Sequence, residues 1–313
     1  MLSLGIAFAA REWRVALWDE DHTADLHALR DPDALWTFLQ ETIGNHPAIP
    51  CVLPSGLGIP VTRARDLLDR DIFEMTFRAE PETAEPLSAF LAHARHRLPT
   101  AFCIPGVKGL PTVPLPRKLS RADLGGAELV CAAGWSLHLL ARSEAPRSFV
   151  LLHVGPGSRE LLAVDGGRVV DGIGSSVVGL GPDRGLDGRG PAPGSSPAAW
   201  WVREGTRVTE AEARSPGCGR AARWEALEKE VLALAGAYGL PHVIVTGEAR
   251  AVALEALPGR IEYRSLPSQL DGYEPALGAA VLAAGLTGGP TAPLVDRLAL
   301  REARDRVLDF LRP

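Results

Sequence analysis

Residues 149–173 read FVLLHVGPGSRELLAVDGGRVVDGI, and this stretch carries the pattern that decides the fold. Two apolar runs, Phe149–Val154 and Glu160–Val164, are separated by the turn residues GPGS, and the tight turn DGG leads to a third run at Arg168–Val170. Short runs of β-branched and aliphatic residues joined by glycine-containing turns are typical of antiparallel strands in hairpins. The stretch therefore predicts a three-stranded β-meander.

A similar order of elements opens the chain. The apolar run Leu2–Phe8 is followed by a polar break and by Trp13–Trp18, which together predict a β-hairpin. Asp31 then suits the N-cap of a helix, and Pro32 suits its first position. Two strand-rich beginnings, each at the head of about half the chain, predict an α/β protein with a duplicated domain. Because the residue identities do not repeat, this prediction rests on the order of elements.

A helix is predicted between the two halves. Ser120–Asp123 has the S-x-x-D form of a capping box and apolar residues continue at helical spacing, so a linking helix is expected over about 120–141. The N-terminal domain is thus predicted at residues 1–145 and the C-terminal domain at 146–313. A segment at about 179–197, dense in Gly, Pro, Asp and Ser, predicts a mobile loop because it offers little apolar surface to bury.

A ligand-facing strand end is predicted in the second half. A helical pattern stops at Gly239, and the short buried-type strand His242–Val245 follows and ends at a Thr-Gly pair. The backbone of Gly247, with Glu248 and Arg250 just after it, could line a nucleotide base or ribose. A strand that ends in Thr-Gly is also common without any ligand, so both interpretations stay open.

The first turn of the meander is a candidate phosphate site. Gly155 and Gly157 would let backbone amides approach an anion closely, and Ser158 would add a hydroxyl donor. The same residues suit a plain hairpin turn without a ligand. Spacing alone leaves both interpretations open.

Basic residues precede the predicted linking helix. Arg117, Lys118 and Arg121 lie where positive side chains and free helix amides could together hold a phosphate or a carboxylate. A solvated basic turn is the competing interpretation. Asp123 is a candidate catalytic acid, although the capping box would also account for it.

Composition and charge exclude several function classes. The chain has 313 residues and a formal net charge of -5, so it lacks the basic excess that nucleic-acid binding requires. The four cysteines form no CxxC pair, which predicts neither a zinc site nor a disulfide framework and fits a reducing cytoplasm. Because no apolar run approaches the roughly 18 residues of a membrane span and no signal-peptide pattern opens the chain, we expect a cytoplasmic protein without a membrane partner.

Common catalytic motifs are also missing from the sequence. The histidines form no HExxH pattern, and neither GxSxG nor GxxxxGK[ST] occurs. Zinc proteases, α/β-hydrolases and P-loop NTPases are therefore excluded, and no metal ligands are identified.

Several passages, in order along nearly the whole chain, match the pattern of one known family. They are PSGLGIP at 54–60, PGVKGLPTVP at 105–114 running into RKLSRADLG at 117–125, DGGRVVDGIG at 165–174, and a last passage from GAA at 278–280 through AGLTGG at 284–289 to LD at 308–309. Through these passages the chain resembles an uncharacterised family of predicted butyrate kinases in the actin, sugar-kinase and Hsp70 ATPase superfamily.

The resemblance implies an α/β protein in which two duplicated ribonuclease-H-like domains flank a cleft for ATP and Mg²⁺. By position, the first phosphate turn would be Ala7–Arg11, the second Gly155–Ser158, and the adenosine loop Gly247–Arg250. The resemblance further implies an ATP-dependent phosphotransferase that acts on a small carboxylate such as a short-chain fatty acid. Its partners would be the nucleotide and the carboxylate, and the oligomeric state is left open, with a homodimer as one option.

The implied reaction is in-line attack of the substrate carboxylate on the γ-phosphate. Arg117 and Arg121 are then candidate clamps for a carboxylate or phosphate, and Asp123 is a candidate acid that organises the metal. All three would lie at the linking helix and face the cleft.

The chain departs from the superfamily pattern at its phosphate turns. Ala7 and Ala9 stand where an acidic metal ligand and a glycine are usual, and His153 stands where an aspartate is common. The linking helix has GAEL at 126–129 where the family tends towards Thr-Ala-Asp-Lys. Because phosphoryl transfer relies on positioned charge, these changes favour an alternative, a catalytically degenerate relative that binds a nucleotide or metabolite as a regulatory or scaffold protein. A purely structural protein without a ligand is the third option.

Overall fold

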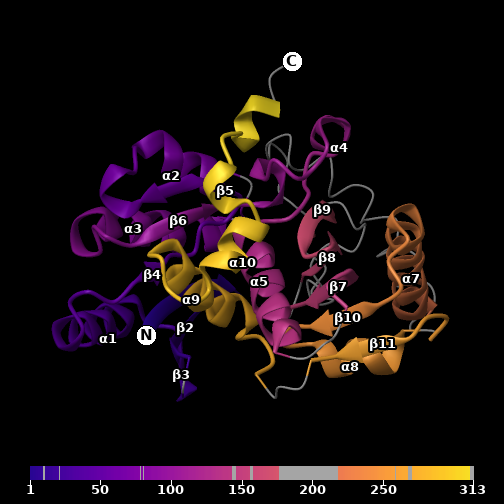
Figure 1. The fold of residues 1–313 in the computed structure, drawn as a ribbon, viewed down its shortest axis with the longest axis horizontal. Helices are drawn as coiled ribbons and strands as arrows, with labels where there is room; N and C mark the ends of the chain where they lie inside the picture. The colour runs from indigo at the N-terminus through magenta and orange to yellow at the C-terminus, as the bar shows by residue number, and fades with distance from the viewer. Residues whose placement is uncertain are drawn as a thin grey trace.

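The computed structural model describes residues 1–9, 11–20, 22–77, 79, 81–142, 146–155, 158–175, 218–257, 259–266 and 270–310. Within these ranges the strands form two sheets, with helices between and outside them (Figure 1). The strands are β1 (Ser3–Ala9), β2 (Glu12–Asp19), β3 (His22–Leu29), β4 (Cys51–Val52), β5 (Gly58–Arg63), β6 (Phe102–Pro105), β7 (Phe149–Val154), β8 (Arg159–Asp165), β9 (Arg168–Ile173), β10 (Val243–Thr246) and β11 (Tyr263–Ser265). The helices are α1 (Pro32–Asn45), α2 (Asp69–Thr76), α3 (Pro81–Arg97), α4 (Leu115–Ser120), α5 (Ala127–Ala141), α7 (Cys218–Tyr238), α8 (Arg250–Ala256), α9 (Glu274–Leu286) and α10 (Ala292–Arg297), with 3-10 turns η1 (Ala64–Asp66), η2 (Val107–Gly109), η3 (Leu300–Glu302) and η4 (Val307–Phe310).

The first sheet has the strand order β3-β2-β1-β4-β6-β5. Strands β1, β2 and β3 form an antiparallel meander, β4 and β6 run parallel to β1, and β5 is an antiparallel edge strand. The predicted opening hairpin is confirmed. The predicted start of the following helix is confirmed as well, because the side chain of Asp31 accepts the backbone N–H of Asp33 at 3.2 Å.

The second sheet has the strand order β11-β10-β7-β8-β9. Its antiparallel meander, β7 to β9, covers the predicted one, and β10 and β11 run parallel to β7. In both sheets the first strand of a meander is flanked by its antiparallel partner on one side and by parallel strands on the other. This shared order confirms the predicted duplicated α/β fold.

Alternating side chains divide each sheet into an outer and an inner face. On β1, Leu4, Ile6 and Phe8 face outward into a core shared with α1, α2 and α3. On the second sheet, Val150 and Leu152 face outward into a core shared with α7 and α8. Each fully buried side chain of this kind contributes about 1.5–3 kcal/mol to folding, so the outer faces are well anchored.

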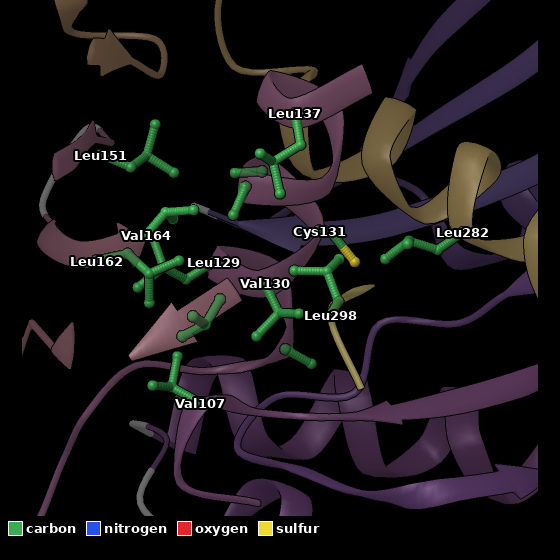
Figure 2. Close-up of a cluster of buried hydrophobic side chains, with 14 of the residues drawn as sticks. Val107, Leu129, Val130, Cys131, Leu137, Leu151, Leu162, Val164, Leu282 and Leu298 are labelled. Atoms are coloured by element: carbon green, nitrogen blue, oxygen red, sulfur yellow. The ribbon is translucent and has the colours of Figure 1, made fainter. Parts of the chain in front are cut away.

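The inner faces of the two sheets are separated by α5 and α9. Figure 2 shows Leu151, Leu162 and Val164 of the second sheet pointing toward Leu129 of α5, and Leu282 of α9 lies on the other side of that helix. These side chains belong to one continuous buried cluster. The position of α5 relative to both sheets is therefore set by apolar packing on two sides.

Helix α9 approaches its neighbours at backbone distance. A Cβ atom at Gly5 of β1 would lie 1.9 Å from the carbonyl oxygen of Ala276, and one at Gly278 would lie 1.8 Å from the carbonyl oxygen of Cys131 on α5. Only glycine leaves room for such contacts, so α9 lies tightly between β1 and α5.

The predicted linking helix begins later than expected. Ser120 is the last residue of α4, and α5 begins only at Ala127, so the predicted capping box is wrong. Asp123 instead accepts the backbone N–H of Gly125 at 2.9 Å, and Gly125 has φ +108, a conformation that an α-helix does not contain. The chain between the two helices crosses β9, where Leu124 lies against Gly172.

The end of the chain returns to the first sheet. Helix α9 packs on β1 and β2, and η3 contacts β5. The predicted domain limits at residues 145 and 146 stay a prediction, and the predicted loop at about 179–197 lies outside the described residues. No helix of the described ranges is long and apolar enough to span a bilayer.

We expect Gly278→Ala to destabilise the protein by about 2–3 kcal/mol, because the added methyl group must displace the backbone of α5. The matched control is Gly236→Ala on the exposed face of α7, where a Cβ would meet nothing within 4 Å. The control should be neutral or stabilising by up to about 1 kcal/mol. Urea denaturation followed by circular dichroism measures both changes, and equal effects would contradict the proposed contact.

Candidate functional site

The carboxyl ends of the central strands of both sheets meet at one place. There, Arg14 near the start of β2 pairs with Glu248 just after β10, and the backbone N–H of Gly174, just after β9, donates to the carbonyl oxygen of Asp123 in the segment between α4 and α5 at 3.4 Å. A narrow pocket in this region, without room for a water molecule, is lined by residues from β1, the segment after β4, and the starts of α5 and α9, among them Ala7, Ser55, Glu128 and Pro275. In α/β folds this edge of a sheet is where ligands usually bind.

Glu128 brings a carboxyl group into this pocket from the first turn of α5. The backbone N–H of Gly56 donates to its Oε1 at 3.3 Å. Burial raises the pKa of Glu128 to about 7, against the opposing effect of backbone hydrogen bonds. Near neutral pH this group therefore exists in both protonation states.

Glu160, on β8, lies within electrostatic range of Asp123 and Glu128. Burial raises the pKa of Glu160 to about 8, and the negative charges of Asp123 and Glu128 add to this effect. Asp123, which accepts from Gly125, also lies against Gly174 of the second sheet. The site thus involves three carboxyl groups, one from β8 of the second sheet, one from α5 and one from the segment between α4 and α5.

Oxygen donors of this kind fit Mg²⁺, which is commonly bound by one or two carboxylates together with substrate phosphates and water. Among the described residues no group of three or more His, Cys, Asp or Glu side chains has the arrangement of a self-sufficient metal site. The described side chains therefore supply at most one or two ligands, and a cation here would depend on phosphate and water oxygens for the rest.

His153, which stands where an aspartate is common in the resembled superfamily, ends the central strand of the second sheet. Its Nδ1 lies 3.1 Å from the hydroxyl of Thr246 at the end of β10. Burial lowers the pKa of His153; the negative charge of Glu274 opposes this shift and the positive charge of Arg14 adds to it. The imidazole is thus neutral at physiological pH and supplies no charge to a ligand.

The predicted adenosine loop is tied to α9 by a buried carboxylate. Glu274 accepts the backbone N–H groups of Gly247 at 3.1 Å and Gly272 at 2.7 Å. Gly247 has φ +98, and a Cβ there would lie 2.4 Å from the carbonyl oxygen of Val154. Contacts within the protein thus account for this glycine and for the partner of its amide.

The charged residues of the same loop form ion pairs. The carboxylate of Glu248 binds the guanidinium of Arg14, and Nη2 of Arg250 lies 3.0 Å from Oδ1 of Asp271. Burial alone would lower the pKa of Arg14, but the hydrogen bond to Glu248 and the charges of Glu248 and Glu12 outweigh it and raise the pKa. Glu248 and Arg250 therefore connect this loop to β2 and to the turn before α9.

Two residues of the predicted basic clamp, Arg117 and Lys118, form separate ion pairs within the protein. Nε of Arg117 lies 2.7 Å from Oδ2 of buried Asp171, and Nζ of Lys118 lies 2.7 Å from Oδ2 of Asp305. The carbonyl oxygen of Arg121 accepts a hydrogen bond from Lys108 at 3.0 Å. The structure thus places Asp123 within electrostatic range of Glu160, whereas the catalytic role of Asp123 and the clamp roles of Arg117 and Arg121 stay predictions.

The second predicted phosphate turn is closed by its own backbone. Gly155 donates its N–H to the carbonyl oxygen of Ser158 at 2.9 Å, and Gly157 lies outside the described residues. In the first turn, Arg11 has φ +63 and pairs with Glu82 in an exposed contact of 2.7 Å. Phosphate binding by either turn stays a prediction.

Three charged residues of the site are not in the predicted set. Glu128 enters the sequence interpretation only as a departure from a family pattern, and Glu160 and Arg14 enter it only as residues of predicted strands. Arg14 is the inward-facing cross-strand neighbour of Ala7, and Glu160 is that of His153. The available signal was a charge at an inward position of an otherwise apolar strand.

Comparisons with known proteins agree with this architecture. The model of a family described as "Protein of unknown function (DUF1464)" matches residues 22–188, more than half of the chain. Among curated proteins, no sequence matches.

Several solved structures are similar to the chain. Acetate kinase from Entamoeba histolytica aligns with 82% of this chain and 85% of its own at 11% identity, with a TM-score of 0.50. An activator of 2-hydroxyisocaproyl-CoA dehydratase from Clostridium difficile, solved with bound ADPNP, aligns with 97% of this chain and 99% of its own at 11% identity, with a TM-score of 0.45. The similarity to acetate kinase concerns the fold alone: the chain shares the α/β fold of that kinase.

We expect Glu160→Gln to stabilise the protein above pH 8. The raised pKa means that folding favours protonated Glu160, so this contribution to stability is complete below about pH 4.5 and is lost as the pH rises to about 8. The variant should gain up to about 5 kcal/mol over the wild type above pH 8, at about 1.4 kcal/mol per pKa unit, and almost nothing near pH 4. Denaturation curves across this pH range measure the difference in the free energy of unfolding. Glu41→Gln, at an exposed position of α1, is the control. A gain in stability that is independent of pH would contradict the raised pKa of Glu160.

Proposed function

The chain belongs to the DUF1464 family of proteins of unknown function, and on that premise we propose that it is a phosphotransferase that moves the γ-phosphoryl group of ATP to a small carboxylate. The observation that supports this most directly is the meeting of Asp123, Glu128 and Glu160 at the strand ends of the two sheets. Such a site can hold a cation beside a polyphosphate at the edge where ligands bind in α/β folds. The carboxylate acceptor is proposed from the resemblance to the predicted butyrate kinases.

Mg²⁺ would be held mainly by phosphate oxygens and water, with Glu128 as the carboxylate ligand from the protein. When bound, it would neutralise charge on the phosphates during transfer. Glu128 and Glu160, with pKa values raised to about 7 and about 8 while no cation is present, would ionise on binding it. Binding would then release protons from this site.

The acceptor side of the reaction requires positive charge rather than a base. A carboxylate is already ionised at neutral pH, so no group needs to remove a proton from it before attack. Arg117 and Arg121 are the proposed clamps for this group. Arg117 would exchange its contact with Asp171 for one with the substrate carboxylate.

The second candidate function is nucleotide binding without catalysis. Ala7 supports it, because this residue lines the pocket with a methyl group, is only 4% exposed, and lies in the cluster that packs on α9. Neutral His153 at the equivalent end of the second sheet adds to the argument. A protein of this kind would act as a regulatory or scaffold subunit whose conformation depends on whether a nucleotide is bound.

The two candidates are separated by turnover. Calorimetric titration with ATP, with and without Mg²⁺, measures binding, and a phosphoryl-transfer assay with acetate and butyrate measures catalysis. Binding together with carboxylate-dependent turnover supports the phosphotransferase, and binding without turnover supports the regulatory protein. Absence of nucleotide binding would contradict both.

We expect Glu128→Gln to lower the turnover rate by about 10²-fold or more, because it removes an anionic ligand from the proposed metal site. The fold should persist, since glutamine can still accept the N–H of Gly56. Glu85→Gln on the exposed surface of α3 is the matched control and should leave turnover unchanged. Turnover of Glu128→Gln equal to that of the control would remove Glu128 from the mechanism.

The turnover rate of the wild-type protein should fall as the pH decreases through about 7 at limiting Mg²⁺. Protonation of Glu128, whose pKa burial raises to about 7, competes with the metal, so the loss occurs below this pH and recovers above it. Higher Mg²⁺ should shift the midpoint to lower pH. A pH–rate profile that does not respond to the Mg²⁺ concentration would contradict this role.

A further inference from the structure

A buried arginine of the first sheet pairs with a carboxylate of the second. Arg14 lies on β2, and its Nη2 donates a hydrogen bond to Oε2 of Glu248 in the turn between β10 and α8. Its Nε and Nη2 also lie 3.4 Å from Oε2 of Glu12 on the same strand. The contact between Arg14 and Glu248, named here the latch, joins the two sheets at their strand ends.

The arginine is fixed independently of Glu248. Its side chain is 9% exposed, and its guanidinium lies over the ring of Tyr273 at 5.5 Å from the centroid. Nη1 lies so close to Gly272 that a Cβ there would be 1.8 Å away. Together with Glu12, these contacts hold the positive charge in place next to Ala7, its cross-strand neighbour.

The glutamate is the exposed partner of the latch. The side chain of Glu248 is 47% exposed, so its carboxylate can turn into water at little cost, whereas Arg14 cannot. Carboxylate and phosphate oxygens present the same kind of acceptor to a guanidinium. A phosphate that enters at the strand ends would therefore compete with Glu248 for Arg14.

We propose that Arg14 is an oxyanion site that Glu248 occupies in the ligand-free protein, so that a phosphate group must displace Glu248 and open the latch in order to bind. The ligand chemistry is a phosphate oxyanion, from a nucleotide or from free pyrophosphate. That the phosphate belongs to a nucleotide rests on the proposed function, whereas the competition between Glu248 and a phosphate for Arg14 does not. Binding of the anion and release of the contact between the sheets are then coupled events.

A purely structural ion pair would behave in the opposite way. If Glu248 only supported the site, its removal would leave anion affinity unchanged or weaken it. If Glu248 competes with the ligand, its removal must strengthen binding. The sign of the change in affinity therefore distinguishes the two roles.

The experiment compares Glu248→Gln and Glu248→Ala with Glu225→Gln, which breaks the exposed ion pair with Lys229 on α7. Hydrogen–deuterium exchange of the ligand-free proteins reports on residues 247–257, and calorimetry measures the affinity for pyrophosphate and for ATP. We expect faster exchange in this segment and about fivefold or more tighter pyrophosphate binding in both Glu248 variants. The control should show neither change.

Each outcome has a defined meaning. Tighter binding of both pyrophosphate and ATP supports the latch together with a nucleotide ligand. Tighter pyrophosphate binding without any ATP binding supports the latch and contradicts the nucleotide function proposed above. Unchanged exchange, or pyrophosphate affinity that is unchanged or weaker in the Glu248 variants, overturns the latch.

Discussion

Helix α9 touches the backbone of both neighbours, and this close approach fixes the helices that carry the site. Gly5 lacks the side chain that would keep α9 away from β1, and Gly278 lacks the one that would keep α9 away from α5. As a result, the first turns of α5 and α9 lie beside the carboxyl ends of the central strands. Glu128 and Glu274 reach the pocket and the loop at Gly247 from these first turns. Because backbone contacts cannot adjust as side chains do, the geometry of the strand-end region depends on them.

Buried polar groups near the strand ends serve two different purposes. Glu274 has both carboxylate oxygens occupied by backbone N–H groups, which makes it a structural anchor for the loop at Gly247. Glu128 and Glu160 are held with raised pKa values, at a cost in stability at neutral and alkaline pH. Carboxyl groups kept in such an environment are typical of functional sites, where a ligand or cation offsets the cost.

Local sequence patterns predict the strands and helices, whereas the grouping of the site residues depends on contacts between distant parts of the chain. Both meanders could be predicted because strand period and turn residues are encoded within a few positions. The linking helix was placed too early at Ser120, since the passage of Leu124 across β9 is not visible in local spacing. The grouping of Glu128 with Glu160 depends on how the two sheets face each other, which no motif within one segment records.

The duplicated fold presents opposite charges from its two halves. On the inner face of the first sheet, near its first turn, Ala7 is paired with Arg14; at the corresponding region of the second sheet, His153 is paired with Glu160. A neutral central strand thus has an ionisable side chain on the neighbouring strand in both cases, a guanidinium in one sheet and, in the other, a carboxyl group whose pKa burial raises to about 8. A polyphosphate with its cation contains both signs of charge, so it would satisfy the guanidinium on one side and the carboxyl groups on the other. An anion alone would satisfy only the first sheet, which makes the paired charges a reason to expect the metal and the phosphate to bind together.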